Sequence, residues 1–112
     1  MLGIKTLQEV CETVGVTRRA VQGYEKRGLV SPTGKNKYGY LLYDSMAQER
    51  IALIKRYQKL GFKLREVEEL VDAPNYIVKE ALLKQVDKLQ EDNKEKMELI
   101  KLAKRWIESL TD

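Results

Sequence analysis

The amino-acid sequence predicts a mainly α-helical protein, in which a winged helix-turn-helix domain is followed by a long coiled-coil dimerisation helix. Three observations carry this prediction. Two short helical segments meet at a turn that contains Gly15, a stretch rich in glycine and tyrosine follows them, and the chain from Tyr76 onward contains neither glycine nor proline. The 112 residues suit one small module. We expect the winged domain to occupy residues 1–74 and the dimerisation helix residues 75–112.

The first helix is predicted over residues 7–14. Thr6 and Glu9 fit a capping box, in which the threonine side chain accepts from the amide three residues later and the glutamate returns the bond. Gly15 can end this helix in a left-handed conformation. Thr17 can then serve as the N-cap of a second helix. The apolar positions of that helix recur at helical spacing: Ala20, Val21 and Tyr24.

This pair of helices has the pattern of a helix-turn-helix, whose second helix enters the major groove of DNA with its N-terminal residues. Arg19 can fork onto a phosphate or onto the edge of a guanine, while Tyr24 combines a hydroxyl suited to phosphate with a ring that anchors the helix. The candidates for DNA contact from the second helix are therefore Thr17, Arg18, Arg19, Gln22 and Tyr24.

Residues 30–43 suit a β-hairpin, which begins after Gly28 closes the second helix. The stretch combines proline, two glycines and three tyrosines, and it carries Lys35 and Lys37 at its expected tip. A hairpin directly after a helix-turn-helix is a wing. Its lysines are better placed for phosphates than for bases, and each phosphate contact adds about one unit to the salt dependence of binding.

Two further helices are expected between the wing and the long helix. Asp44 is a good N-cap for a third helix that Gly61 ends. A fourth short helix is expected over residues 64–71, before Pro74. The third helix carries Met46, Ile51, Leu53, Ile54 and Leu60 as apolar residues, and its exposed face is expected to hold Arg50, Lys55, Arg56 and Lys59.

The last segment predicts a helix of about 35 residues, roughly 50 Å long at 1.5 Å per residue. A domain this small cannot cover such a helix with its own core, so the helix needs a partner, most simply a second copy of the chain. The alternative is a single amphipathic helix folded back on its own domain. One heptad register places these residues on a seam interrupted by Asn93 and Lys96: Leu82, Val86, Leu89, Asn93, Lys96, Ile100, Ala103, Ile107 and Leu110.

Charge is unevenly distributed along the chain. Residues 1–63 carry 12 Lys/Arg against 5 Asp/Glu, a net charge of +7, while residues 64–112 carry 9 against 12, a net charge of −3. The two sum to the net +4 of the whole chain. An acidic partner is therefore expected to meet the front half, although a basic surface by itself is equally typical of a merely solvated domain.

Several classes of protein are disfavoured by the composition. The chain has no histidine and a single cysteine, Cys11, which fits the edge of a core better than a redox sensor, so neither a metal site nor a cofactor is expected. No apolar run approaches a membrane span and no signal peptide is evident, so we expect a cytoplasmic protein. Enzymatic activity is not expected, because the neighbouring carboxylates lie on lysine-rich helical faces and no phosphate loop or nucleophile elbow occurs.

These motifs resemble the MerR family of bacterial transcription regulators. The similarity is carried by the segment GVTRRAVQGYEKRGLVSP of residues 15–32, by the wing with its Gly39-Tyr40 pair and Tyr43, and by the later segment LGFKLREV of residues 60–67. It covers residues 2–73 by motif and the last helix by architecture. The resemblance implies a homodimer, joined by an antiparallel coiled coil, that binds double-stranded DNA.

The resemblance also implies a function and a set of contacts. Such a dimer would bind a near-palindromic operator within a promoter and distort the DNA so that RNA polymerase can start transcription. Arg18, Arg19 and Tyr24 match DNA-contacting positions of the family's recognition helix, and Lys35 and Tyr40 match contacting positions in its wing, whereas Tyr43 matches a position that packs the wing onto the core.

Three departures from the family pattern limit what can be transferred. Gln22 stands where the family usually has arginine, Gly23 replaces a common aromatic residue, and Leu41 replaces the arginine that typically follows the Gly-Tyr pair. Gly23 costs a helix about 1 kcal/mol relative to alanine, so it either loosens the recognition helix or permits a close approach. The operator sequence and affinity of relatives are therefore not expected to apply.

Effectors and rival functions stay open. The cysteines of metal-sensing members and the large C-terminal domain of drug-sensing members do not occur in these 112 residues. Three alternatives therefore stay open: the protein has no effector, it binds an effector in a cleft between the long helix and the domain, or the chain is a fragment of a longer protein. Trp106 either packs the end of the coiled coil or lines a small pocket. The rival functions are a DNA-architecture protein resembling recombination directionality factors and a coiled-coil adaptor whose basic head binds RNA or protein.

Overall fold

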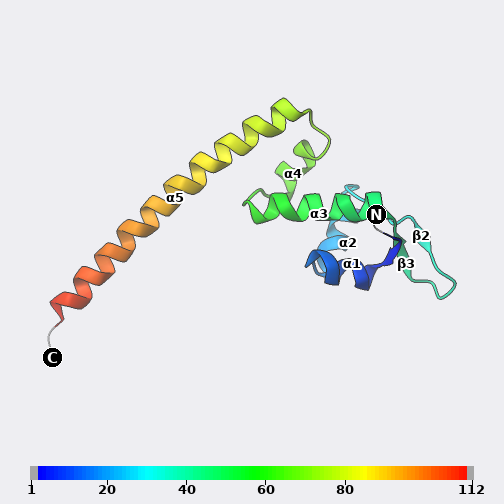
Figure 1. The fold of residues 1–112 in the computed structure, drawn as a ribbon, viewed down its shortest axis with the longest axis horizontal. Coiled ribbons are helices and arrows are strands. Elements are labelled where there is room, and N and C mark those ends of the chain that lie inside the picture. Colours follow the sequence, from blue (N-terminus) through cyan, green and yellow to red (C-terminus); the bar gives the residue numbers. More distant parts are fainter. Residues whose placement is uncertain (1–2, 111–112) are drawn as a thin grey trace. The chain divides into compact units, whose positions relative to one another are not determined.

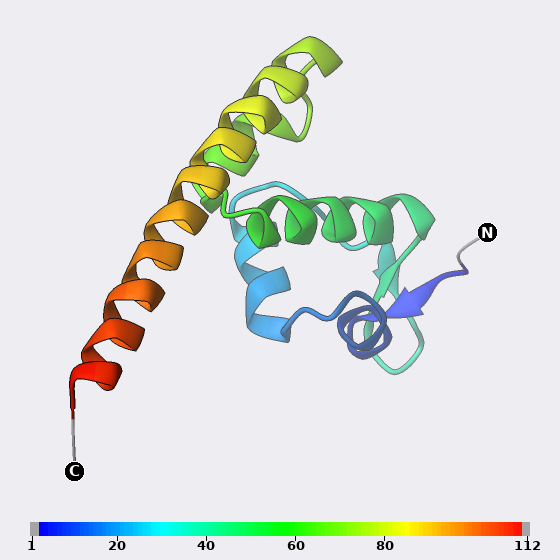
Figure 2. The same ribbon diagram turned by 60° about the vertical axis from the view of Figure 1, so that its left-hand side comes forward.

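The computed structural model describes residues 3–110. The described residues form two compact units, the first ending at Asp72 and the second beginning at Ala73. Figure 1 shows the order of the elements, and Figure 2 shows the first unit from another side. The expected outer ends of the two domains, residues 1–2 and 111–112, lie outside the described residues.

The two predicted helices of the helix-turn-helix are confirmed as α1 (Leu7–Val14) and α2 (Arg18–Lys26). The capping box is formed: the amide of Glu9 donates to Thr6 Oγ1 at 3.3 Å, and the amide of Thr6 donates to Glu9 Oε1 at 2.9 Å. Gly15 follows with φ of +81°, and its amide donates to the carbonyl of Cys11. Thr17 caps α2 through its hydroxyl, which accepts from the amide of Ala20 at 3.0 Å.

The predicted wing is confirmed as β2 (Gly34–Lys35) and β3 (Leu41–Tyr43), but the sheet has a third strand that was not predicted. This strand, β1 (Lys5–Thr6), pairs antiparallel with β3, so the order is β1-β3-β2. Lys5 lies opposite Tyr43, and Gly34 opposite Leu42. Two residues are too few to show an alternating pattern, so only the position of β3 makes β1 a strand.

The helices after the wing are α3 (Ser45–Lys59) and α4 (Leu64–Leu70), and Asp44 Oδ1 accepts from the amide of Ala47 at 2.9 Å as a cap. Met46, one of the apolar residues of α3, is 77% exposed, because it lies in the first turn and off the buried face of the helix. One expectation for α3 was wrong. Arg50 does not lie free on an exposed face, because its side chain reaches back to the carbonyl of Leu29 at 2.9 Å.

The core of the first unit lies between these helices and the sheet. Tyr57 of α3 meets Phe62 edge to face, with ring centroids 5.6 Å apart. Each of the helices α1 to α4 and the strand β3 contributes at least one apolar side chain to this core, which explains why so small a sheet can be held in place. The largest fully buried side chains are Val10, Val21, Tyr24, Tyr43, Ile51, Ile54 and Val67.

The second unit consists of one helix, α5 (Asn75–Ser109), of 35 residues, as predicted. None of its residues is buried in the single chain, including those with large apolar side chains. Across residues 3–110, no helix combines the length and the apolar character that crossing a bilayer requires. A helix whose apolar side chains are all accessible has a surface that a partner can cover.

Candidate nucleic-acid interface

The N-terminal half of α2 presents a polar and basic face to solvent. Thr17, Arg18, Arg19 and Gln22 are all exposed. Neither arginine forms an ion pair with an acidic residue of the described chain, so both guanidinium groups are available to an external anion. The capping hydroxyl of Thr17 fixes the start of the helix and thereby the direction in which these side chains leave it.

Tyr24 lies on the opposite face of α2, in the core. Its side chain is 2% exposed, its hydroxyl donates to Gln58 Oε1 of α3 at 2.5 Å, and burial raises the pKa of its phenol. A side chain so covered offers no surface to DNA, so the expectation of a DNA contact from Tyr24 is corrected. Its predicted second role, anchoring the helix through its ring, agrees with this position.

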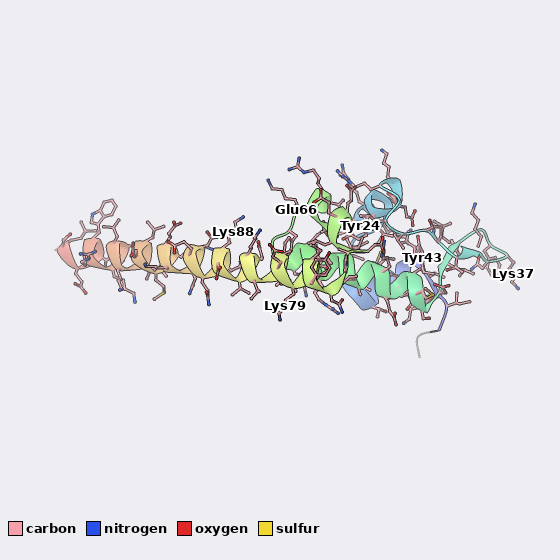
Figure 3. All side chains as sticks on the ribbon, turned by 90° about the horizontal axis from the view of Figure 1, so that it is seen from above. Tyr24, Lys37, Tyr43, Glu66, Lys79 and Lys88 are labelled. Atoms are coloured by element: carbon pink, nitrogen blue, oxygen red, sulfur yellow. The ribbon has the colours of Figure 1, made fainter. Side chains whose placement is uncertain are left out.

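The wing carries the second group of predicted contacts at its outer end, where Figure 3 shows Lys37. Lys35, Lys37 and Tyr40 are all exposed. The turn between the strands is built on Asn36, whose side-chain oxygen accepts from the amides of Tyr38 and Tyr40 at 2.9 and 3.0 Å. Sequence reasoning assigned Asn36 no role, although an asparagine followed by glycine three residues later signals a turn.

Tyr38 is a candidate contact that the sequence analysis did not select. It is 71% exposed, its ring lies 6.5 Å from that of Tyr40, and Lys37 Nζ lies 5.1 Å from its centroid. Exposed aromatic rings beside a lysine combine a flat apolar surface with positive charge, a combination suited to a sugar-phosphate backbone. The sequence signal that could have identified Tyr38 is the alternation of lysine and tyrosine in the wing.

A hollow of about 420 Å³ joins the recognition helix to the wing. Arg18 lines it from α2, and Tyr40 lines it from the wing. Residues from the start of α1, which sequence reasoning did not include, complete the wall. The structure therefore brings one predicted contact from α2 and one from the wing to a single concave surface, which is lined by Thr6, Leu7, Gln8, Arg18, Gly39, Tyr40 and Leu41.

Cys11 and Lys63 do not line this concave surface. Cys11 is half-buried, and burial raises the pKa of its thiol, which keeps the reactive thiolate scarce at neutral pH. Lys63 precedes α4, and its amide donates to Glu66 Oε1 at 2.9 Å, so the position has a structural role in the main chain. Among residues 3–110, no three histidine, cysteine, aspartate or glutamate residues gather in a group that could hold a metal ion.

The predicted dimer seam on α5 is accessible along most of its length. Leu82 is half-buried and all the other seam residues are exposed: Val86, Leu89, Asn93, Lys96, Ile100, Ala103, Ile107 and Leu110. Three further large apolar side chains, which the heptad pattern did not include, are exposed near the C-terminal end of the helix: Leu99, Leu102 and Trp106. Their exposed fractions are 63%, 57% and 68%.

The chain is similar to known transcription regulators in sequence and in structure. Residues 5–74 match the model of a family described as MerR HTH family regulatory proteins. Over 104 residues the chain is 31% identical to the HTH-type transcriptional activator mta of Bacillus subtilis, an alignment that covers 93% of this chain and 40% of that protein. The chain spans about half or less of the length of the curated relatives it matches.

Solved structures show the same fold. The N-terminal part of the Bacillus subtilis multidrug transporter activator, MtaN, superposes with a TM-score of 0.72 at 30% identity, covering 92% of this chain and 97% of that one. HiNmlR, a MerR family regulator lacking the sensor domain and bound to promoter DNA, superposes with a TM-score of 0.71 at 16% identity, covering 94% of this chain and 90% of that one. The second likeness concerns the fold alone.

Proposed function

The chain belongs to the MerR family of HTH regulatory proteins, and from this premise we propose that it regulates transcription by binding a promoter operator as a homodimer. The observation that carries the proposal is the concave surface on which Arg18 of α2 and Tyr40 of the wing meet. A recognition helix and a wing that share one surface can grip a major groove and the adjacent backbone together.

In this proposal, α2 reads bases and the wing holds phosphates. Arg19 and Gln22 lie on the exposed face that would enter the major groove, where arginine prefers guanine and glutamine prefers adenine. Lys35, Lys37 and Tyr40 would contact the backbone from the wing. The net charge of +7 over residues 1–63 supports this orientation, because it concentrates positive charge in the half that carries both elements.

The homodimer is proposed from α5. Its seam presents apolar side chains to solvent, among them Leu89 at 42% and Ile107 at 66% exposure, which a second copy could cover. A twofold dimer presents two recognition helices and therefore matches an operator with inverted symmetry. The proposal further includes distortion of the bound promoter and thereby an action on RNA polymerase in the cytoplasm. The name of mta, a transcriptional activator, supports the regulation of transcription.

A DNA-architecture protein was the principal rival. The family match and the regulators among the relatives favour transcription regulation over that alternative. A selection experiment separates the two: duplexes are selected from a random pool at near-physiological salt, and the enriched sequences are examined for symmetry. An enriched inverted repeat supports a dimeric sequence reader, whereas retention without enrichment contradicts the proposal.

Arg19→Ala tests the placement of the recognition helix on the selected operator. We expect affinity to fall at least severalfold while the dimer stays intact, because the arginine is exposed and makes no ion pair within the described chain. Lys79→Ala removes the same charge from α5, in the other unit, and serves as the matched control. Equal affinities for Arg19→Ala and the unmodified chain, measured by fluorescence anisotropy, would show that α2 does not read this DNA.

A further inference from the structure

Tyr43 lies at the root of the wing and is fixed there by its main chain. It is the last residue of β3 and is 0% exposed. Its carbonyl accepts from the side-chain amide of Gln48 on α3 at 2.8 Å, and in the sheet it lies opposite Lys5 of β1. The two strands of the wing are only two and three residues long. Because so short a hairpin is not stable by itself, the contacts of Tyr43 with α3 and β1 help to hold it to the domain.

The side chain of Tyr43 reaches in the other direction, to the recognition helix. Its hydroxyl donates to Oε1 of Glu25, close to the C-terminal end of α2. Burial raises the pKa of Tyr43, and the bond to Glu25 raises it further, so the phenol stays a donor over the physiological range. A hydrogen bond to an ionised carboxylate is stronger than one between neutral groups, and a half-buried carboxylate left without its donor is destabilising.

A second phenol on α2 provides a comparison. Tyr24 donates to Gln58 and thereby holds α2 to α3, whereas Tyr43 and Glu25 hold α2 to the wing. Figure 3 labels both tyrosines within the first unit. Both side chains are almost fully buried, so the two bonds differ chiefly in which pair of elements they join.

We propose that the hydrogen bond from Tyr43 to Glu25 is a positioning contact, which sets the wing relative to the recognition helix so that both meet one duplex. Tyr43 and Glu25 themselves do not touch DNA in this account. The inference rests on the proposed function, because it explains how Arg18 on α2 and Tyr40 on the wing come to share one surface. Without the bond, α2 and the wing would each be intact but less firmly aligned.

The test is a double-mutant cycle on the selected operator. Tyr43→Phe keeps the ring and removes only the hydroxyl, and we expect it to weaken DNA binding about fivefold, the equivalent of one net hydrogen bond. In a background in which Lys35→Ala, Lys37→Ala, Tyr38→Ala and Tyr40→Ala have removed the proposed wing contacts, the same substitution should cost less than about twofold. A cost that persists in that background, or no cost in either, would overturn the proposal.

Two further variants separate positioning from a general loss of packing. Tyr24→Phe also removes a buried phenol bond from α2, but its effect should be the same with and without the four wing side chains, because Gln58 lies on α3. Glu25→Gln keeps an oxygen acceptor and should retain more affinity than Glu25→Ala. If Tyr43→Phe does not fold, Glu25→Ala takes its place in the cycle.

A measurement without DNA keeps this inference distinct from the proposed function. Residual dipolar couplings of backbone amides report whether two segments share one orientation. The amides of α2 and of the wing should fit a single alignment tensor in the unmodified chain and in Tyr24→Phe, but not in Tyr43→Phe. A single tensor in all three proteins contradicts the positioning role, whereas failure to bind any duplex contradicts only the proposed function.

Discussion

At the scale of single residues, Tyr24 and Arg19 show how two side chains five positions apart on one helix acquire different roles. Arg19 is exposed and makes no ion pair within the described chain, whereas Tyr24 is 2% exposed and has its hydroxyl bonded to Gln58. The amphipathic pattern of α2 places them on opposite faces. The chemistry of a tyrosine side chain, with its hydroxyl suited to phosphate, does not by itself reveal which face of the helix the residue occupies.

Gly23 has no structural need to be glycine. A Cβ added there would meet no atom within 4 Å, and its φ lies outside the left-handed region. We predict that Gly23→Ala raises the free energy of unfolding by about 1 kcal/mol, because alanine removes the entropic cost of glycine inside a helix. Urea unfolding followed by circular dichroism gives the value.

Gly15→Ala is the matched control for that prediction. Here too the space around an added Cβ is empty, but φ is +81°, which is unfavourable for a residue with a side chain. We expect this variant to lose about 1 kcal/mol of stability. Two shifts of the same sign would mean that the conformations assigned to the two glycines are wrong.

At the scale of the elements, Arg50 joins three segments of the first unit. Its Nε donates to the carbonyl of Leu29 after α2, and its two terminal nitrogens donate to Oδ1 and Oδ2 of Asp72 at 2.7 and 2.8 Å. This bidentate pair fixes the chain just beyond α4 against α3. The residue that was expected on a solvated face therefore has a structural role.

This pair predicts a pH dependence of stability. Hydrogen bonds from Arg50, together with its charge, lower the pKa of Asp72 below the ordinary value, so the unfolded chain takes up the proton more readily. The stabilisation that the ion pair provides is fully present above about pH 4. It is lost as the pH falls through the lowered pKa of Asp72 in the folded state. Asp72→Asn should lower the urea midpoint at pH 7, and the difference from the unmodified chain should narrow at pH 3.

Asp87→Asn on α5 is the control for Asp72→Asn. It makes the same chemical change at an exposed aspartate that forms no ion pair among residues 3–110. A midpoint difference for Asp72→Asn that is equal at both pH values would mean that the ion pair with Arg50 contributes nothing to stability.

For α5 we predict that Leu89→Asp combined with Ile100→Asp yields a monomer. Both substitutions place a carboxylate on the apolar seam, where association would bury it without a partner. Lys88→Asp combined with Arg105→Asp places carboxylates away from the seam and should leave the dimer intact. Sedimentation velocity distinguishes the two species, and a dimer that survives the seam substitutions would exclude α5 as the interface.

At the scale of the whole molecule, charge separates the two halves of the sequence: residues 1–63 carry a net +7 and residues 64–112 a net −3. A basic reading half attracts DNA from a distance. The acidic excess of the other half lies in residues 64–74, because α5 carries 8 Lys/Arg against 7 Asp/Glu. The same asymmetry makes affinity strongly dependent on salt, because each neutralised phosphate releases counterions.

Lys37→Ala should therefore reduce the slope of log affinity against log salt by about one unit per subunit, or about two for a dimer. It should weaken binding to all duplexes to a similar degree, since a phosphate contact carries no base information. Lys94→Ala on α5 removes an equal charge and should leave the slope unchanged. A loss of sequence preference in Lys37→Ala would contradict a phosphate role for the wing tip.

Features that depend on neighbours in the chain could be predicted from the amino-acid sequence. The capping box of α1, the cap at Thr17, the left-handed Gly15 and the uninterrupted α5 all follow from signals within a few residues, since helices form through local bonds. The wing followed from its turn residues in the same way. The groups of exposed basic residues on α2 and in the wing were therefore predictable.

Which of these residues come into contact depends on the packing of the elements in three dimensions. The hydrogen bonds of Tyr24 to Gln58, Arg50 to Leu29 and Tyr43 to Glu25 join residues 34, 21 and 18 positions apart, and β1 is a strand only because β3 lies beside it. No local pattern encodes such pairings, because they depend on how separate elements pack. Packing therefore determines which candidate contacts stay exposed and brings Arg18 and Tyr40 to one surface.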